Sequence, residues 1–180
     1  NPAPWNARTR VHEYGGRAYL MAGGALFFSH FADQRLYRAD PGRPPRPITP
    51  EAVALRYADL CADARRGLLW CVREDHRAGG EPRNALVALQ EQGDCDSGRI
   101  VAEGRDFYAA PRLNPDGTQL AWLSWNHPDM PWDGCELWLA DVDAQGRLQH
   151  ARRLAGSRDE AVQQPQWSPD GRLHFISDRS

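Results

Sequence analysis

The chain has 180 residues, of which 41% are hydrophobic, and a formal net charge of −2 at pH 7. This near-neutral charge offers no attraction to nucleic acid or to an acidic membrane surface. The sequence contains no run of about 18 apolar residues that would span a bilayer. We therefore expect neither nucleic acid nor a membrane among the partners of this chain.

Short apolar runs, separated by turn-forming residues, predict β-strands along the whole chain. A first group of strands is predicted at 17–22, 25–31, 35–40 and 45–49, and a second at 56–62, 67–73, 83–89 and 98–103. A third group is predicted at 107–113, 118–125, 135–141 and 149–155, followed by two strands at 162–167 and 172–177. Helices are not expected, because the apolar runs are short and are interrupted by Gly, Pro and Asp.

These strands belong to a repeated unit of about fifty residues. The segment 111–125 returns as 165–178, and both copies contain Pro-Asp-Gly, which favours a tight turn between two strands. The third strand of each complete unit carries an equivalent leucine, at Leu36, Leu86 and Leu137. Four strands in a repeat of about fifty residues are typical of the blade of a β-propeller.

The sequence therefore predicts an all-β fold, a partial β-propeller with three four-stranded antiparallel blades and the first hairpin of a fourth. The blades are expected at about 10–50, 55–104, 106–156 and 160–180, within one domain that covers 1–180. Closed propellers contain about four to eight blades, so we interpret the chain as a piece of a longer protein. Its open end would leave a strand edge unpaired, which favours self-association.

The four cysteines do not form a metal-binding pattern. Cys61, Cys71, Cys95 and Cys135 include no C-x-x-C pair, and no histidine lies at a zinc-site spacing from them. Cys61 and Cys71 fall on adjacent predicted strands, so a disulfide between them is conceivable, but buried free thiols are favoured. We therefore predict no metal, no cofactor and a cytoplasmic location.

The strand order predicts that two kinds of connection lie on opposite faces of the propeller. The Pro-Asp-Gly turns lie on one face. The loop that leads into the first strand lies on the other face and contains Arg10, His12, Glu13 and Tyr14 before two glycines. Glu13 could bind an ammonium group and Arg10 a carboxylate, so these four residues form a candidate binding site. The alternative is an Arg10–Glu13 pair, or a bond from Tyr14 to the backbone, that only anchors the first blade.

A second group of candidates on this face is expected to contact a neighbouring domain. It consists of His127, Met130 and Trp132 in a Trp- and Pro-rich loop, together with Phe107 and Tyr108. The loop could instead pack on itself. No G-x-S-x-G motif is present, and no other set of residues predicts a catalytic site within the chain.

Two of these motifs resemble a known family. Arg-Val-His-Glu-Tyr-Gly-Gly at 10–16, and Asn-His-Pro-Asp-Met-Pro-Trp-Asp-Gly at 126–134 followed by Glu-Leu-Trp at 136–138, are similar to the prolyl oligopeptidase family of serine peptidases. The resemblance is strongest to the acylaminoacyl-peptidase and dipeptidyl-aminopeptidase branch. It implies an N-terminal propeller that caps a C-terminal α/β-hydrolase domain. That domain carries the catalytic Ser, Asp and His and lies outside 1–180.

The resemblance also implies a role for this part of the protein. The propeller would restrict access to the catalytic site and help to bind oligopeptide substrates, and its partners would be the oligopeptide and the hydrolase domain of the same parent chain. Without a hydrolase domain, the alternative is a stand-alone propeller that acts as a scaffold for protein partners.

Overall fold

A computed structural model describes residues 4–51 and 54–179, and all regular secondary structure in these ranges is β-strand. Blade 1 contains β1 (Tyr19–Ala22), β2 (Ala25–Ser29), β3 (Leu36–Ala39) and β4 (Arg46–Pro47). Blade 2 contains β5 (Leu55–Asp63), β6 (Leu68–Asp75), β7 (Arg83–Gln90) and β8 (Arg99–Ala102). Blade 3 contains β9 (Phe107–Leu113), β10 (Gln119–Trp125), β11 (Glu136–Val142) and β12 (Leu148–Ala155). The final hairpin contains β13 (Val162–Trp167) and β14 (Leu173–Ser177).

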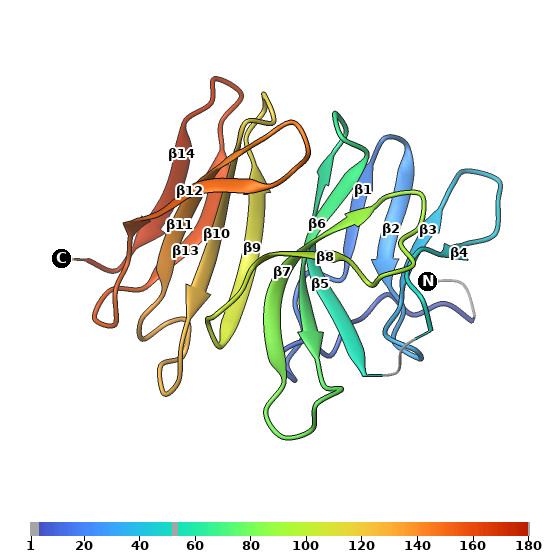
Figure 1. Cartoon of the computed structure of the whole chain (residues 1–180), viewed down its shortest axis with the longest axis horizontal. Helices are drawn as coiled ribbons and strands as arrows, with labels where there is room; N and C mark the ends of the chain where they lie inside the picture. The colour runs from blue at the N-terminus through green and yellow to red at the C-terminus, as the bar shows by residue number, and fades with distance from the viewer. Residues whose placement is uncertain (1–3, 52–53, 180) are drawn as a thin grey trace.

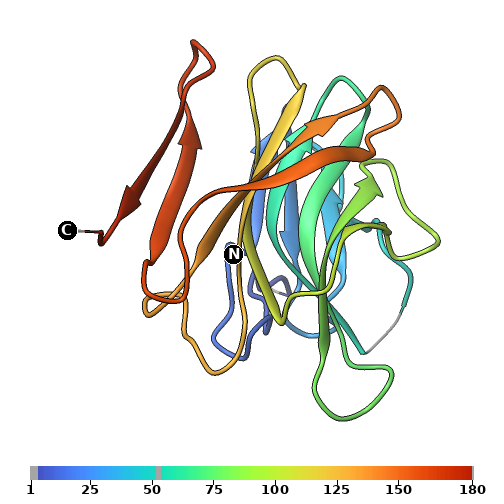
Figure 2. The same cartoon turned by 60° about the vertical axis from the view of Figure 1, so that its left-hand side comes forward.

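The predicted fold class is confirmed. Three four-stranded sheets and one two-stranded sheet are formed by strands that are neighbours in sequence, and each strand pair is antiparallel. The sheets stand side by side in chain order, from blue to red in Figure 1. In Figure 2 the β13–β14 hairpin stands at one end of this series, next to the C-terminus. The architecture is therefore that of a propeller with an open side.

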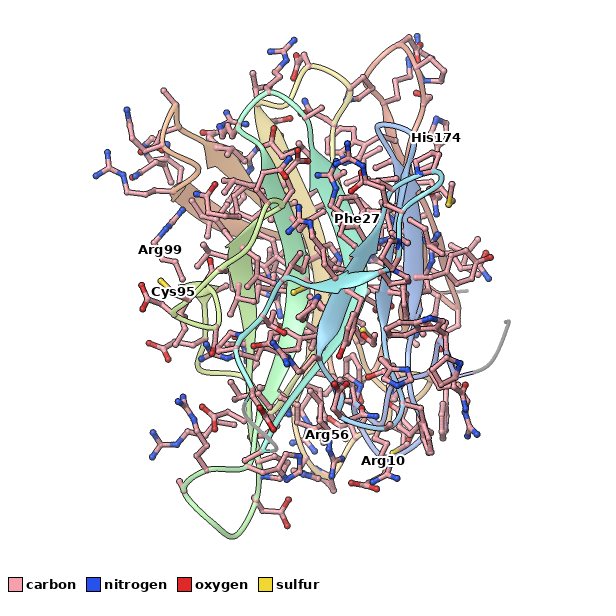
Figure 3. All side chains as sticks on the ribbon, turned by 90° about the vertical axis from the view of Figure 1, so that its right-hand side faces the viewer. Arg10, Phe27, Arg56, Cys95, Arg99 and His174 are labelled. Atoms are coloured by element: carbon pink, nitrogen blue, oxygen red, sulfur yellow. The ribbon has the colours of Figure 1, made fainter. Side chains whose placement is uncertain are left out.

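The two faces predicted from the strand order are observed. Figure 3 places Arg10 and Arg56 at one end of the molecule and His174, which follows a Pro-Asp-Gly turn, at the opposite end. We call the end that carries Arg10 the loop face, because the segment 8–16 and the loops between the second and third strands of the blades lie there. The inner strands β5 and β9 both run from the loop face toward the turns.

An apolar layer fills each space between neighbouring blades. Strand β6 contributes to two of these layers because successive side chains of a strand point to opposite faces. Trp70 packs in the layer between blades 2 and 3, whereas Cys71 packs in the layer between blades 1 and 2. Full burial of a large apolar side chain stabilises the fold by about 1.5–3 kcal/mol, so blades 2 and 3, each covered on both faces, are firmly anchored.

The same alternation explains why the conceivable disulfide does not form. Cys61 packs against the layer that contains Trp70, on the other side of the sheet from Cys71. All four cysteines carry free thiols. Cys71 and Cys135 are buried as expected, Cys61 is half-buried and Cys95 is exposed, so burial was predicted correctly for only part of the set. Burial raises the pKa of the Cys135 thiol to about 12.

Candidate functional site

A cleft of about 690 Å³ lies where the inner strands of the blades converge. We call it the channel cleft, because in a propeller the inner strands border the central channel. Its walls come from the segment before β1, from β5, β9 and β13, and from the end of β10 with the loop that follows it. Side chains that matter below are Tyr14, Arg17, Asp59, Arg112, Trp125 and Gln166.

Three inner strands are bent at matching positions along this cleft. Asp59 of β5, Ala110 of β9 and Gln164 of β13 all adopt the left-handed backbone conformation, with φ of 56°, 50° and 54°. The strand register shifts at each of these positions, as expected for a β-bulge. A bulge bends its strand and redirects side chains, so these residues shape the wall of the channel cleft.

Asp59 joins the inner edges of three blades. One carboxylate oxygen accepts the backbone N–H of Arg17 at 2.9 Å, and the other accepts the backbone N–H of Ala110, also at 2.9 Å. The backbone N–H of Asp59 in turn donates to the carbonyl oxygen of Arg17 at 2.9 Å. A Cβ atom added at Gly16 would lie 3.0 Å from Ala58 Cβ and 3.3 Å from Asp59 Oδ1, so glycine permits this close approach.

The loop that leads into blade 1 is a tight turn. His12 and Glu13 both adopt left-handed conformations, with φ of 56° and 63°. Such conformations cost about 1–3 kcal/mol each for residues other than glycine, so the surrounding structure must hold them in place. The backbone N–H of Gly15 donates to the carbonyl oxygen of Val11 at 2.8 Å, and that of His12 donates to Glu74 Oε2 at 2.6 Å.

Glu74 is the centre of a charged cluster beneath this loop. Its side chain is only 2% exposed, and Oε1 lies 3.0 Å from Arg56 Nη1 and is also hydrogen-bonded to His76 Nε2. Arg56 Nη1 donates as well to Glu13 Oε1 at 2.6 Å and to the carbonyl oxygen of Arg10 at 3.0 Å. The buried carboxylate therefore holds the loop directly through His12 and indirectly through Arg56.

The predicted candidates in this loop have different environments. Glu13 pairs with Arg56 rather than Arg10, and this hydrogen bond lowers its pKa, so the 78% exposed side chain is ionised and open to solvent. The Arg10 guanidinium lies over the Phe31 ring, 4.5 Å from its centroid. Tyr14 is 61% exposed, and no hydrogen bond from its hydroxyl to the backbone is present within the described ranges. Neither anchoring contact proposed as the alternative is formed.

His12 lies in the wall of the channel cleft. Its ring is 5.3 Å from the Phe107 ring and 5.5 Å from the Trp125 ring, measured between centroids. Its Nε2 atom is buried and has no hydrogen-bond partner among the residues that the structure describes. Burial lowers the pKa of His12, with Glu74 and Asp59 acting in the opposite sense. The net effect favours the neutral imidazole.

The second group of candidates is divided between the surface and the core. Phe107 stacks on Trp125 at 5.3 Å, and His127 packs edge-on against Phe107 at 4.8 Å, which places His127 next to the channel cleft. Trp132 is 64% exposed on the same loop, and Met130 is half-buried. Tyr108 lies away from this surface: it is 2% exposed in the layer between blades 2 and 3, where its side chain has a packing role.

Several residues in the cleft and in the adjacent charged cluster could not be identified as site residues from the sequence. Asp59 and Arg112 lie within ordinary strand patterns, and Arg56 meets Glu13 across 43 residues of sequence. Only the blade geometry brings them together. In the part of the chain that is described, no group of three His, Cys, Asp or Glu side chains could hold a metal ion. No helix in the same residues is long and apolar enough to cross a membrane.

Comparisons with known proteins place these features in a family. Solved structures of puromycin hydrolase and of a Mycobacterium tuberculosis puromycin-hydrolyzing peptidase are similar to the chain at 40% and 43% identity, with TM-scores of 0.89 and 0.86. The matches cover 99% and 98% of this chain but only 30% and 29% of those proteins. An oligogalacturonate lyase from Vibrio parahaemolyticus, at 14% identity and a TM-score of 0.63 over 90% of this chain and 48% of the lyase, shares the fold alone.

No protein-family model matches the chain, and no curated protein matches it. The two puromycin-hydrolysing proteins nevertheless match it over almost its whole length. The chain spans less than a third of their length and contains the propeller part only. The chain therefore belongs to the prolyl oligopeptidase family, as part of the N-terminal propeller of its parent protein.

Proposed function

We propose that this chain restricts access to the catalytic site of a serine peptidase and helps to bind its oligopeptide substrates. The observation that carries the proposal is the channel cleft, which opens among the inner strands beside the exposed aromatic and charged side chains of the loop face. A cleft of about 690 Å³ is in the range of pockets that hold small ligands. The solved relatives at 40–43% identity are a hydrolase and a peptidase.

The loop face is the surface that we assign to the hydrolase domain of the parent chain. Trp132 and His127 are exposed there, close to the cleft, and an exposed tryptophan is typical of a contact surface. Arg10, His12, Glu13 and Tyr14 lie beside them at the mouth of the cleft, where a peptide would pass between the two domains. The motifs at 10–16 and 126–134 support a parent from the acylaminoacyl-peptidase and dipeptidyl-aminopeptidase branch. The alternative function, a scaffold for protein partners, has no comparable support.

Access restriction is tested by the length dependence of hydrolysis in the full-length parent. The specificity constant kcat/KM is measured for peptides of increasing length that share the same residues around the scissile bond. We expect hydrolysis of short peptides and a steep decline for long peptides and for an unfolded protein substrate. Equal kcat/KM at all lengths would contradict a gating role. The cytoplasmic location stays a prediction, which fractionation of the source cells would test.

A further inference from the structure

Two arginine side chains in the channel cleft lack a carboxylate partner. Arg17 precedes β1, Arg112 lies near the end of β9, and both line the cleft. Within residues 4–51 and 54–179, neither guanidinium group forms an ion pair. Arg112 Nη1 donates to the carbonyl oxygen of Pro111 at 2.7 Å, whereas its Nε is buried without a hydrogen-bond partner in the same residues. Burying a hydrogen-bond donor of a charged group costs free energy unless an acceptor pairs with it.

Asp59 does not supply this acceptor. It is the one carboxylate among the described residues that line the cleft, and its two oxygens accept the backbone N–H groups of Arg17 and Ala110. Burial and the charge of Arg17 lower the pKa of Arg112, whereas the charge of Asp59 acts in the opposite sense. With two guanidinium groups and one carboxylate among the described residues of its lining, the cleft carries an excess of positive charge.

The arginines lie inside the cleft rather than at its mouth. Arg112 is five residues beyond Phe107, the first residue of β9 at the loop face, and five strand residues rise by roughly 15 Å. Gln164 and Gln166 of β13 line the same cleft and offer further amide donors. A ligand that enters from the loop face would reach the arginines along the channel.

We propose that Arg17 and Arg112 bind the C-terminal carboxylate of an oligopeptide that lies in the channel cleft. The planar guanidinium fork matches a carboxylate geometrically and offers paired, charge-assisted hydrogen bonds. This inference rests on the proposed function and adds an orientation: the amino end of the peptide lies at the loop face near Glu13, and the carboxyl end lies within the propeller. At about 3.3 Å per residue, an extended peptide of roughly four or five residues spans this distance.

Binding is tested with tetra-alanine as the probe and its C-terminal amide as the matched ligand. Affinity for the 180-residue chain is measured by NMR titration, with the Nε–H signal of Arg112 as the local reporter. We expect the free acid to bind on the order of tenfold more tightly than the amide and to shift this signal. Arg17→Gln and Arg112→Gln should reduce the affinity for the acid to that for the amide. Arg152→Gln, an equal change of charge at an exposed site on β12, should have no effect.

If Arg112→Gln does not fold, Arg17→Gln still tests the proposal. Arg17→Gln retains the backbone N–H that donates to Asp59. Equal affinity for the acid and the amide would overturn the proposal. Binding of the acid by the chain but not by the full-length parent would also overturn it, since an acidic side chain of another blade would then hold the arginines. A parent that binds the acid through both arginines but hydrolyses no peptide would support the carboxylate site and contradict the proposed peptidase function.

Discussion

The carboxylate of Asp59 accepts the backbone N–H of Ala110 at 2.9 Å, and this bond joins β5 to β9 at the wall of the channel cleft. The other oxygen accepts the backbone N–H of Arg17, so one side chain fixes three blades relative to one another. Strand pairing operates within each blade, and Asp59 adds a polar connection between blades at the channel. The shape of the cleft therefore depends on this residue.

Asp59→Asn should destabilise the chain without changing its backbone conformation, because asparagine tolerates the left-handed region. The amide has only one acceptor oxygen, so one of the two backbone donors loses its partner, at a cost of about 1–3 kcal/mol in the free energy of unfolding. Urea denaturation measures the effect. Asp159→Asn, in an exposed turn, is the control that should leave the midpoint unchanged. Equal midpoints for both variants would show that Asp59 does not join the blades.

Glu74→Gln should loosen the loop that carries His12 and Glu13. The buried carboxylate serves the His12 N–H, Arg56 and His76, and a neutral amide cannot replace its charge. Arg56 retains Glu13 and a carbonyl oxygen as partners, so we expect the free energy of unfolding to fall by a moderate amount, about 1–3 kcal/mol. Hydrogen exchange at Glu13 and Gly15 should become faster. Glu13→Gln removes an exposed partner and should change stability very little, and a larger loss for Glu13→Gln than for Glu74→Gln would contradict this assignment.

Stability should fall as the pH decreases through the ordinary histidine pKa of 6.5, partly because of His12. Burial keeps its imidazole neutral in the folded protein at a pH where the unfolded chain binds a proton. The unfolded state then gains protons that the folded state does not bind, so the stabilising contribution is complete above pH 6.5 and is lost below it. His12→Asn tolerates the left-handed backbone and should show a weaker decline in denaturation experiments at pH 8 and pH 5. Parallel pH profiles would exclude His12 as the source.

The repeat in the sequence was sufficient to predict the strands, because Pro-Asp-Gly turns and short apolar runs are local signals. Most of the candidate site could not be predicted from the sequence, because its residues come together only in the folded chain. The bulges at Asp59, Ala110 and Gln164 contain no glycine that would mark a left-handed residue. Tyr108 was expected at the loop face together with Phe107, yet successive side chains of β9 point to opposite faces, so Tyr108 lies in the layer between blades 2 and 3.

The partners of charged residues were equally difficult to predict. Glu13 was expected to pair, if at all, with Arg10, three residues away. It pairs with Arg56 of the next blade, because the two inner edges meet at the loop face. The arginines of the cleft likewise come from different blades, so no spacing in the sequence indicates that Arg17 and Arg112 line the same cleft.

The exposed faces of the first blade and of the last hairpin should cause self-association. Tyr19 and Met21 on β1, and Phe175 and Ile176 on β14, are exposed apolar side chains on the first blade and the last hairpin. Exposed apolar surface next to unpaired strand edges favours association. Sedimentation should show a mass that rises with concentration, and Ile176→Thr should reduce this rise. A monomer at every concentration would contradict the prediction.

We propose that the loop face of this propeller contacts the amino end of a peptide substrate. The most direct test compares kcat/KM for peptides with free and acetylated N-termini in the full-length parent. Glu13 is the residue to replace, because its exposed carboxylate lies beside the cleft and its loss should leave the propeller folded. We predict that Glu13→Gln lowers kcat/KM by about tenfold for peptides with a free amino group and much less for acetylated peptides. Equal losses for both would mean that Glu13 only anchors the loop through Arg56, and no loss for either would contradict the claim.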